Sequence, residues 1–287
     1  MANFSNIKLI GVDLDGTLLN SEGRVTDATL KAIDELHKRG VLLVPTTGRS
    51  FFATHKSLTQ NPAVEYVISS DGAAIDCKKT GERNLVEIDE KKLELIYKVL
   101  NKYTVVYINH VLGKDAISNS DAKEEYVESF GFSDYYKSFI RECTYKTDFL
   151  EELFGPLGVE CVCAFFKCTE DYEAAIKELN TIKGIQVVHS VKNSVEIIDS
   201  RAGKGNGILR LAKSLGIENE QVAVFGDSNN DISMIRAFEN SFCMENGAAE
   251  VKKEAGYIAC SNDDCLGEYI LKLLDGKIVP QRGGRQI

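Results

Sequence analysis

Long apolar runs are absent from this sequence, and none approaches the roughly 18 consecutive residues that a membrane-spanning helix needs. Residues 1–6 also lack a basic and apolar leader, so we expect a soluble protein that stays in the cytoplasm. Only four prolines occur among 287 residues, and no segment is of low complexity. These absences exclude collagen-like, mucin-like and disordered chains and indicate an ordinary globular protein.

Histidine is scarce, with four residues, and the eight cysteines show no C-x-x-C spacing. Cys161 and Cys163 lie two apart in an apolar run, so they share one face of a predicted strand, and Cys168 follows just beyond. A structural zinc ion takes four close ligands, and disulfides are typical of small secreted domains. We therefore expect reduced core cysteines and no zinc site.

Positive charge is in deficit, because 34 Lys and Arg residues face 43 Asp and Glu residues, which gives a net charge of −9. The average field of such a chain repels nucleic acid and acidic membranes. We expect neither as a partner. A phosphorylated substrate would then need a local positive site.

Several common binding and catalytic signatures are also missing. There is no G-x-x-x-x-G-K-[ST] loop and no G-x-S-x-G elbow. The glycines of residues 203–207 do not have the G-x-G-x-x-G spacing of dinucleotide loops. Residues 227–238 open like a calcium-binding EF-hand loop, but Ile232 and Phe238 stand where that loop needs Gly and Glu.

The chain does contain an alternation of strands and helices. An apolar strand is predicted at residues 7–13, a helix from Thr26 to Gly40, a strand at 41–44, a helix from about residue 50 and a strand at 64–69. The same alternation returns after residue 196, with a helix, a strand and a helix predicted between residues 207 and 238. Strands that alternate with helices pair in parallel, so we predict an α/β fold with a Rossmann-like parallel sheet.

Residues 88–195 interrupt this alternation of strands and helices, and they contain predicted helices and strands of their own. A length of 287 residues also suggests about two domains. We therefore predict a discontinuous core domain of residues 1–87 and 196–287, with an inserted α+β domain at 88–195.

Polar and charged residues follow the predicted core strands where these end. Asp13 and Asp15 end the first strand, residues 47–49 the second, Asp71 the third, and residues 226–231 a later one. Ligands bind at the carboxyl ends of parallel strands, so these four loops should converge on one edge of the sheet.

The acidic residues at this edge suit metal-assisted phosphoryl chemistry. Asp13 and Asp15 repel each other unless a cation compensates, and oxygen ligands from Asp13 and from Asp227 or Asp231 suit Mg²⁺. Beside a metal, Asp13 can attack phosphorus, while Asp15 can protonate the departing alkoxide and then activate water.

Donors for a phosphoryl group lie on the neighbouring loops. Thr47 offers a hydroxyl, Gly48 offers a backbone N–H, and Lys204 offers a positive charge at the start of a predicted helix. Together these groups could surround the negative oxygens of a transferring phosphoryl group.

Four motifs in this order resemble those of the haloacid dehalogenase-like phosphatases. They are D-L-D-G-T at residues 13–17, T-G-R at 47–49, K-G at 204–205 and G-D-S-N-N-D at 226–231. The insertion between the second and third motifs resembles the α/β cap of the Cof-like branch, many members of which act on sugar phosphates and related metabolites. The resemblance spans nearly the whole chain.

This resemblance implies a role for each matching residue. Asp13 would be the nucleophile and a Mg²⁺ ligand, Asp15 the acid/base whose backbone carbonyl also binds the metal, and Asp227 the third ligand. The remaining matching residues would hold the phosphate (Thr47, Gly48, Lys204 and Asn230) or support the site (Asp231, which orients Lys204 or the metal-bound waters, and Arg49).

One residue departs from the family pattern, because Asp71 stands where relatives usually have Asn. Its extra carboxylate could reject the most anionic substrates or pair with Arg49. In the predicted cap, Tyr107, His110 and Lys114 lie near a strand end, where they could contact a leaving group or simply form the surface of a small domain.

The leading hypothesis is a Mg²⁺-dependent phosphomonoesterase for small phosphorylated metabolites, with sugar phosphates as the first class to test. A phosphomutase or phosphotransferase that uses the same aspartyl phosphate is a second reading. A sensor that binds a phosphometabolite without turnover is a third. We expect a monomer or a weak homodimer.

Overall fold

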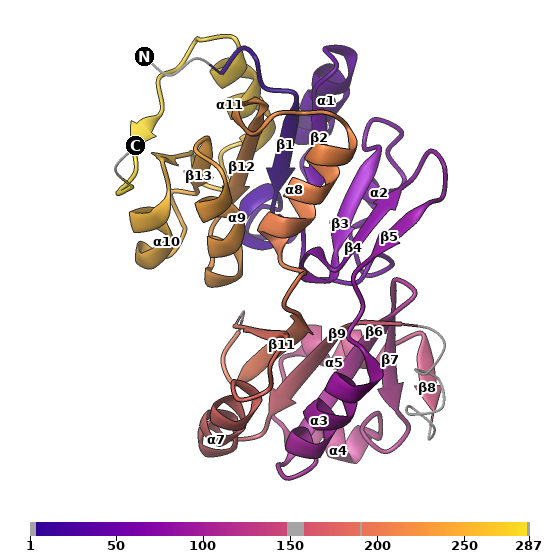
Figure 1. Cartoon of the computed structure of the whole chain (residues 1–287). Coiled ribbons are helices and arrows are strands. Elements are labelled where there is room, and N and C mark those ends of the chain that lie inside the picture. Colours follow the sequence, from indigo (N-terminus) through magenta and orange to yellow (C-terminus); the bar gives the residue numbers. More distant parts are fainter. Residues whose placement is uncertain (1–3, 148–157, 190, 286–287) are drawn as a thin grey trace. The chain divides into compact units, whose positions relative to one another are not determined.

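The computed structural model describes residues 4–147, 158–189 and 191–285, and Figure 1 traces them. The chain forms two compact units. The first, here the core unit, comprises the residues up to Gly48, Thr54–Asn84 and the residues from Gly203 onward. The second, here the cap unit, comprises Arg49–Ala53 and Leu85–Ala202.

A six-stranded sheet organises the core unit, with the strand order β15-β14-β13-β12-β1-β2. The strands pair in parallel except β15, which pairs antiparallel with β14. Strand β1 lies in the interior of the sheet, and its four residues are all buried, which explains its unbroken apolar sequence. The strands are β1 (Leu9–Val12), β2 (Leu42–Pro45), β12 (Val222–Gly226), β13 (Ser241–Cys243), β14 (Tyr257–Ile258) and β15 (Gln281–Arg282).

Amphipathic helices cover this sheet. Helix α1 (Asp27–Lys38) begins where the Thr26 side chain accepts a hydrogen bond from the Thr29 backbone N–H, and it packs against α11 (Leu266–Leu274). Helices α8 (Lys204–Ser214) and α9 (Ile232–Ala237) share a buried apolar cluster with β1, β2 and β12. Helix α10 (Ala249–Glu254) packs against α9.

The third predicted strand and the helix before it differ from expectation. Strand β3 (Tyr66–Ser69) meets the end of β2 through a parallel bridge between Thr46 and Ile68, but it forms its ladder with antiparallel β4 (Ala74–Cys77), which β5 (Arg83–Leu85) follows in the sheet. The helix predicted from about residue 50 is reduced to α2 (Lys56–Thr59). The preceding residues instead join the cap unit, where the Phe52 backbone N–H donates to the Gly113 carbonyl.

The cap unit is built on a second six-stranded sheet with the order β10-β11-β9-β6-β7-β8. Helices α3 (Glu90–Leu100) and α7 (Thr169–Leu179) bury their apolar residues against this sheet. Helices α4 (Glu124–Ser129) and α5 (Asp134–Arg141) connect β7 to β8. The strands are β6 (Val105–Val111), β7 (Lys114–Ser118), β8 (Tyr145–Thr147), β9 (Val159–Phe166), β10 (Ile185–Val188) and β11 (Ser194–Asp199).

The boundary predicted after residue 195 would divide β11 between two domains. Strand β11 instead belongs entirely to the cap unit, which continues to Ala202, because β11 is hydrogen-bonded to both β9 and β10.

Among the described helices, none combines the length and the apolar character that a membrane span needs.

Gly72 provides a test of how the core unit is assembled. It has a φ of +84°, and a Cβ there would lie 2.1 Å from the Gly203 carbonyl oxygen, next to the start of α8. Gly23 has a similar φ of +70° but open space around it. We expect Gly23→Ala to lower the free energy of unfolding by about 1–2 kcal/mol and Gly72→Ala by at least about 3 kcal/mol more, as measured by denaturant unfolding. Equal losses would contradict the close packing of these two loops.

Candidate functional site

Asp13 lies directly after β1 and is 5% exposed. Its backbone N–H donates to the Phe225 carbonyl of β12, and its own carbonyl accepts from the Leu18 N–H. The chain turns sharply at residues 14–18, where Gly16 has a φ of +82° that favours glycine. This turn fixes Asp13 at the carboxyl end of β1 and places Asp15, which is exposed, in the same loop.

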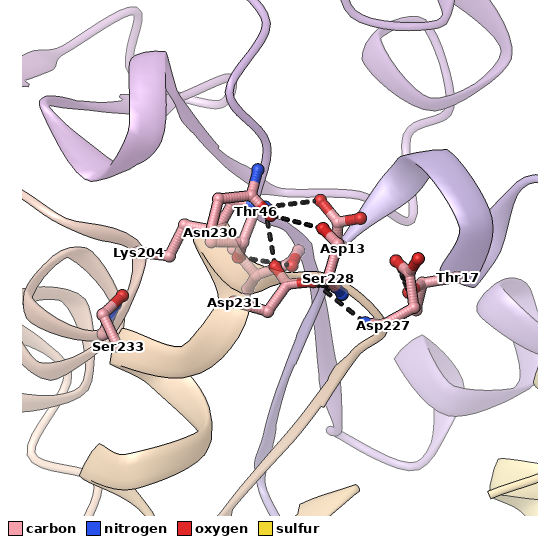
Figure 2. Close-up of polar contacts among 11 residues, drawn as sticks. Asp13, Thr17, Thr46, Lys204, Asp227, Ser228, Asn230, Asp231 and Ser233 are labelled. Carbon is pink, nitrogen blue, oxygen red and sulfur yellow. Dashed lines mark hydrogen bonds and ion pairs between the residues drawn. The ribbon is translucent and has the colours of Figure 1, made fainter. Parts of the chain in front are cut away.

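Lys204 is the first residue of α8, and its side chain is fully buried. Its Nζ lies 2.7 Å from Oδ1 of Asp13 and 2.7 Å from Oδ1 of Asp231. Dashed lines in Figure 2 mark the ion pairs among these residues. Burial disfavours the charged amine, but the two carboxylates, with Asp71 adding to them, outweigh burial and raise the pKa of Lys204 well above its usual value. Lys204 therefore stays positively charged.

Asp231 connects Lys204 to the loop after β12. Its Oδ2 accepts hydrogen bonds from the backbone N–H groups of Asp227 (2.9 Å) and Ser228 (3.1 Å), while its Oδ1 accepts from Lys204. A Cβ on Gly226 would lie 2.6 Å from the Asp231 side chain, so only glycine permits this approach. The loop is thereby held in one conformation around a buried carboxylate.

Asp227 faces Asp13 from this loop. Its Oδ1 accepts a hydrogen bond of 3.0 Å from the Thr17 hydroxyl, and Asn246 Nδ2 donates to the carbonyl of Gly16 in the opposite loop. Sequence reasoning gave Thr17 no role beyond its place in the motif and overlooked Asn246. The D-x-D-x-T spacing pointed to Thr17, whereas no local pattern marks Asn246.

Three carboxylates of this site can meet at one point. One oxygen from each of Asp13, Asp227 and Asp231 lies within 4.8 Å of the others. Burial, followed by the charge of Asp231, raises the pKa of Asp227 to about 6, and the same two causes raise the pKa of Asp13 well above its usual value. Lys204 alone does not offset these charges. A hard divalent cation fits this oxygen cluster, because it would relieve the repulsion that raises both pKa values.

The predicted phosphate-binding groups lie on the neighbouring loops of the core unit. Thr47 is buried between β2 and β3, with its backbone N–H donating to Ile68 and its carbonyl accepting from Asp71. Gly48 follows and is half-buried. Asn230 Oδ1 accepts a 2.6 Å hydrogen bond from the Ser228 hydroxyl and lies beside Asp231 in Figure 2. The four predicted loops thus belong to the core unit, except for Arg49 at the end of the second loop.

Comparison with known proteins identifies the family. The profile of the haloacid dehalogenase-like hydrolases matches residues 10–269. A putative phosphatase of Streptococcus pyogenes is 30% identical over 90% of this chain and 95% of its own length. This chain belongs to the haloacid dehalogenase-like hydrolases.

Other relatives of this hydrolase agree with its fold and enzyme class. The Bacillus subtilis phosphatase YwtE, which acts on 5-amino-6-(5-phospho-D-ribitylamino)uracil, is 27% identical over 94% of this chain and 99% of its own. A solved haloacid dehalogenase-like hydrolase of B. subtilis is 25% identical, with a TM-score of 0.77 over 95% of this chain and all of its own. The predicted family, the α/β fold with a parallel-sheet core and the phosphatase class are confirmed.

Arg49 and Asp71 are not brought together in one unit. Arg49 belongs to the cap unit, where Nη1 donates to the Ala53 carbonyl, and Asp71 belongs to the core unit of the hydrolase. Asp71 is 1% exposed with a φ of +49°, and neither of its carboxylate oxygens has a hydrogen-bond partner in the described part of the chain. Its buried carboxylate contributes to the raised pKa of Lys204.

The cap residues singled out from the sequence have separate surroundings. Tyr107 stacks on Tyr97 with ring centroids 5.4 Å apart, within the apolar cluster under α3. His110 is 2% exposed, and the Lys114 amine lies over the rings of Phe52 and Tyr145. Tyr107 is therefore a packing residue.

The raised pKa of Asp227 gives a pH-dependent prediction for the metal-free hydrolase. Because folding raises this pKa from 3.8 to about 6, the folded state binds the proton more tightly, and this group lowers stability as the pH rises through that window. Asp227→Asn should therefore raise the free energy of unfolding by up to about 3 kcal/mol at about pH 8 and by much less at about pH 4.

Denaturant unfolding in the presence of a chelator measures this difference. Asp34→Asn, at an exposed position of α1, is the control and should change stability little at either pH. If Asp227→Asn shifts stability equally at both pH values, the electrostatic account of the carboxylate cluster is wrong.

Proposed function

We propose that this hydrolase removes phosphate from small phosphomonoesters with Mg²⁺, through a phosphoryl intermediate on Asp13. The observation that supports this most directly is the pairing of the Asp13 carboxylate with buried Lys204 at 2.7 Å, next to the carboxylate cluster. A carboxylate held between a fixed cation and a metal site remains a nucleophile in a buried setting. The named phosphatases among the relatives favour hydrolysis over a phosphomutase or a sensor.

The Mg²⁺ ligands would be the side chains of Asp13 and Asp227 and the backbone carbonyl of Asp15. When bound, the ion supplies charge neutralisation and polarises a phosphoryl oxygen. Asp231 binds Lys204 through one oxygen and backbone N–H groups through the other, so it serves to position Lys204 and the loop. Because Asp231 has these partners, the side chains that would bind the metal are those of Asp13 and Asp227.

The remaining phosphoryl oxygens need donors, because negative charge spreads over them in the transition state. Lys204 supplies a permanent positive charge, and the Thr47 hydroxyl, the Gly48 N–H and the Asn230 amide supply hydrogen bonds. Helix α8 holds Lys204, and backbone hydrogen bonds of Thr47 and Asp231 hold the two loops that carry the other groups. Such fixed donors need little reorganisation during the reaction.

Asp15 would transfer the protons. The oxygen–phosphorus bond of the ester breaks as Asp13 forms its own bond to phosphorus, and Asp15 protonates the departing alkoxide. Asp15 then removes a proton from the water that attacks the aspartyl phosphate, which releases phosphate and regenerates Asp13. The exposure of Asp15 on the turn at Gly16 suits a residue that must reach both leaving group and water.

The substrate class would be small phosphorylated metabolites, with sugar phosphates and phosphorylated sugar alcohols tested first. The relative YwtE acts on a compound with a phosphorylated ribityl chain, which supports this order. A panel of such esters, assayed for phosphate release, identifies the preferred class.

Loss of the nucleophile tests the reaction itself. The wild-type hydrolase should release phosphate from an aryl phosphate with Mg²⁺ and lose this activity with excess chelator. Asp13→Asn should lower the rate at least about 1,000-fold, because the amide cannot accept the phosphoryl group. Circular dichroism checks that the variant folds, and Asp34→Asn serves as the active control. A folded Asp13→Asn variant with full activity would refute the assignment.

Asp71 should influence the affinity for anionic substrates. Its buried charge offsets part of the positive field of Lys204, so Asp71→Asn should lower the KM for phosphate esters by about fivefold with little change in kcat. The effect should be larger for a phosphorylated sugar acid than for a neutral sugar phosphate. Steady-state kinetics on both substrates measures this, and an unchanged KM for both would remove Asp71 from the determinants of specificity.

A further inference from the structure

A second cluster of metal-binding residue types lies in the cap unit, on neighbouring strands that Figure 1 labels β7, β6 and β9. His110 of β6 pairs with Cys161 of β9 on one side and with Asp115 of β7 on the other. Directly paired residues project from the same face of a sheet, and Cys163 shares that face because it is two residues beyond Cys161. The sheet register therefore brings one imidazole, two thiols and one carboxylate together.

The distances within this cluster match those between ligands of one ion. Cys161 Sγ and Cys163 Sγ are 3.8 Å apart, and Cys163 Sγ lies 3.4 Å from His110 Nε2. In a tetrahedral zinc site with Zn–S bonds of about 2.3 Å and Zn–N bonds of about 2.0 Å, two sulfurs are about 3.8 Å apart and sulfur and nitrogen about 3.5 Å. The three ligand atoms all lie within 4.8 Å of one another.

Asp115 offers an oxygen ligand beside this cluster. Its Oδ1 lies 3.5 Å from His110 Nε2 and is buried without a hydrogen-bond partner in the described part of the chain. A second buried acid, Glu160, lies beside Cys161 in sequence and accepts a 2.7 Å hydrogen bond from the Gly113 N–H. Buried acidic groups are costly unless a positive group compensates them.

The donor types select the kind of metal. Thiolate and imidazole ligands favour Zn²⁺ and related transition ions, whereas the all-oxygen cluster of the core unit suits hard cations. We propose that His110, Cys161 and Cys163 bind a Zn²⁺ ion, with Asp115 completing the shell directly or through one water. The ion joins β6 to β9 next to the irregular register at His110 and Val111, so it stabilises the cap unit.

Cobalt substitution of the whole protein tests this site. Co²⁺ added to metal-stripped wild-type protein should give thiolate-to-cobalt charge transfer and the intense visible bands of tetrahedral cobalt, and zinc should displace it at about one ion per chain. Asp227→Asn, which removes a ligand from the oxygen cluster of the core unit, should keep these bands. If wild-type protein lacks these cobalt bands, the proposal is wrong. His110 and Cys163 would then form a metal-free ion pair, or the two cysteines would form a disulfide.

Single variants assign the ligands. Cys161→Ala and Cys163→Ala should each lose at least about half of the charge-transfer absorbance, because each removes one of the two sulfur ligands. Cys243→Ala, which removes an equally buried thiol of the core unit, is the matched control and should keep the absorbance. Circular dichroism shows whether each variant folds. Undiminished bands in folded Cys161→Ala and Cys163→Ala would also overturn the proposal.

Discussion

The buried amine of Lys204 between the carboxylates of Asp13 and Asp231 is the interaction on which the candidate site depends. A buried charge without a partner costs several kcal/mol, so the chain must keep all three groups together or lose the fold of this region. The partners come from the end of β1, the start of α8 and the loop after β12, with Asp13 and Lys204 separated by 191 positions. One electrostatic requirement thus ties together the parallel sheet, the helix that packs on it and the reacting groups.

Glycines make this convergence possible. Gly226 leaves room for the Asp231 side chain, Gly72 allows its loop to touch the residue before α8, and Gly16 turns the chain so that Asp13 and Asp15 share one loop. Burial and the remaining repulsion among the carboxylates raise the pKa of Asp13 and Asp227, and a divalent cation would relieve this repulsion. The arrangement that is unfavourable without a cation is therefore the one that favours metal binding.

Local pattern was sufficient to predict the strand ends and the family, because β1 and β12 are unbroken apolar runs followed by acidic loops. It was insufficient where partners come from other parts of the chain. The Phe52 backbone bonds to Gly113, so residues 49–53 join the cap unit and no long helix follows. Likewise, only the pairing of β6 with β9 brings His110 near Cys161 and Cys163, and the residue spacing gave no sign of it.

The central claim is that Asp13 accepts the phosphoryl group. The direct measurement is to quench the enzyme with acid during turnover of a phosphorylated substrate, reduce it with borohydride and analyse its peptides by mass spectrometry. An aspartyl phosphate is reduced to homoserine, so the account predicts homoserine at position 13 in protein trapped during turnover and none without substrate. Homoserine at another aspartate, or a phosphorylated residue of another type that turns over with the substrate, would contradict it.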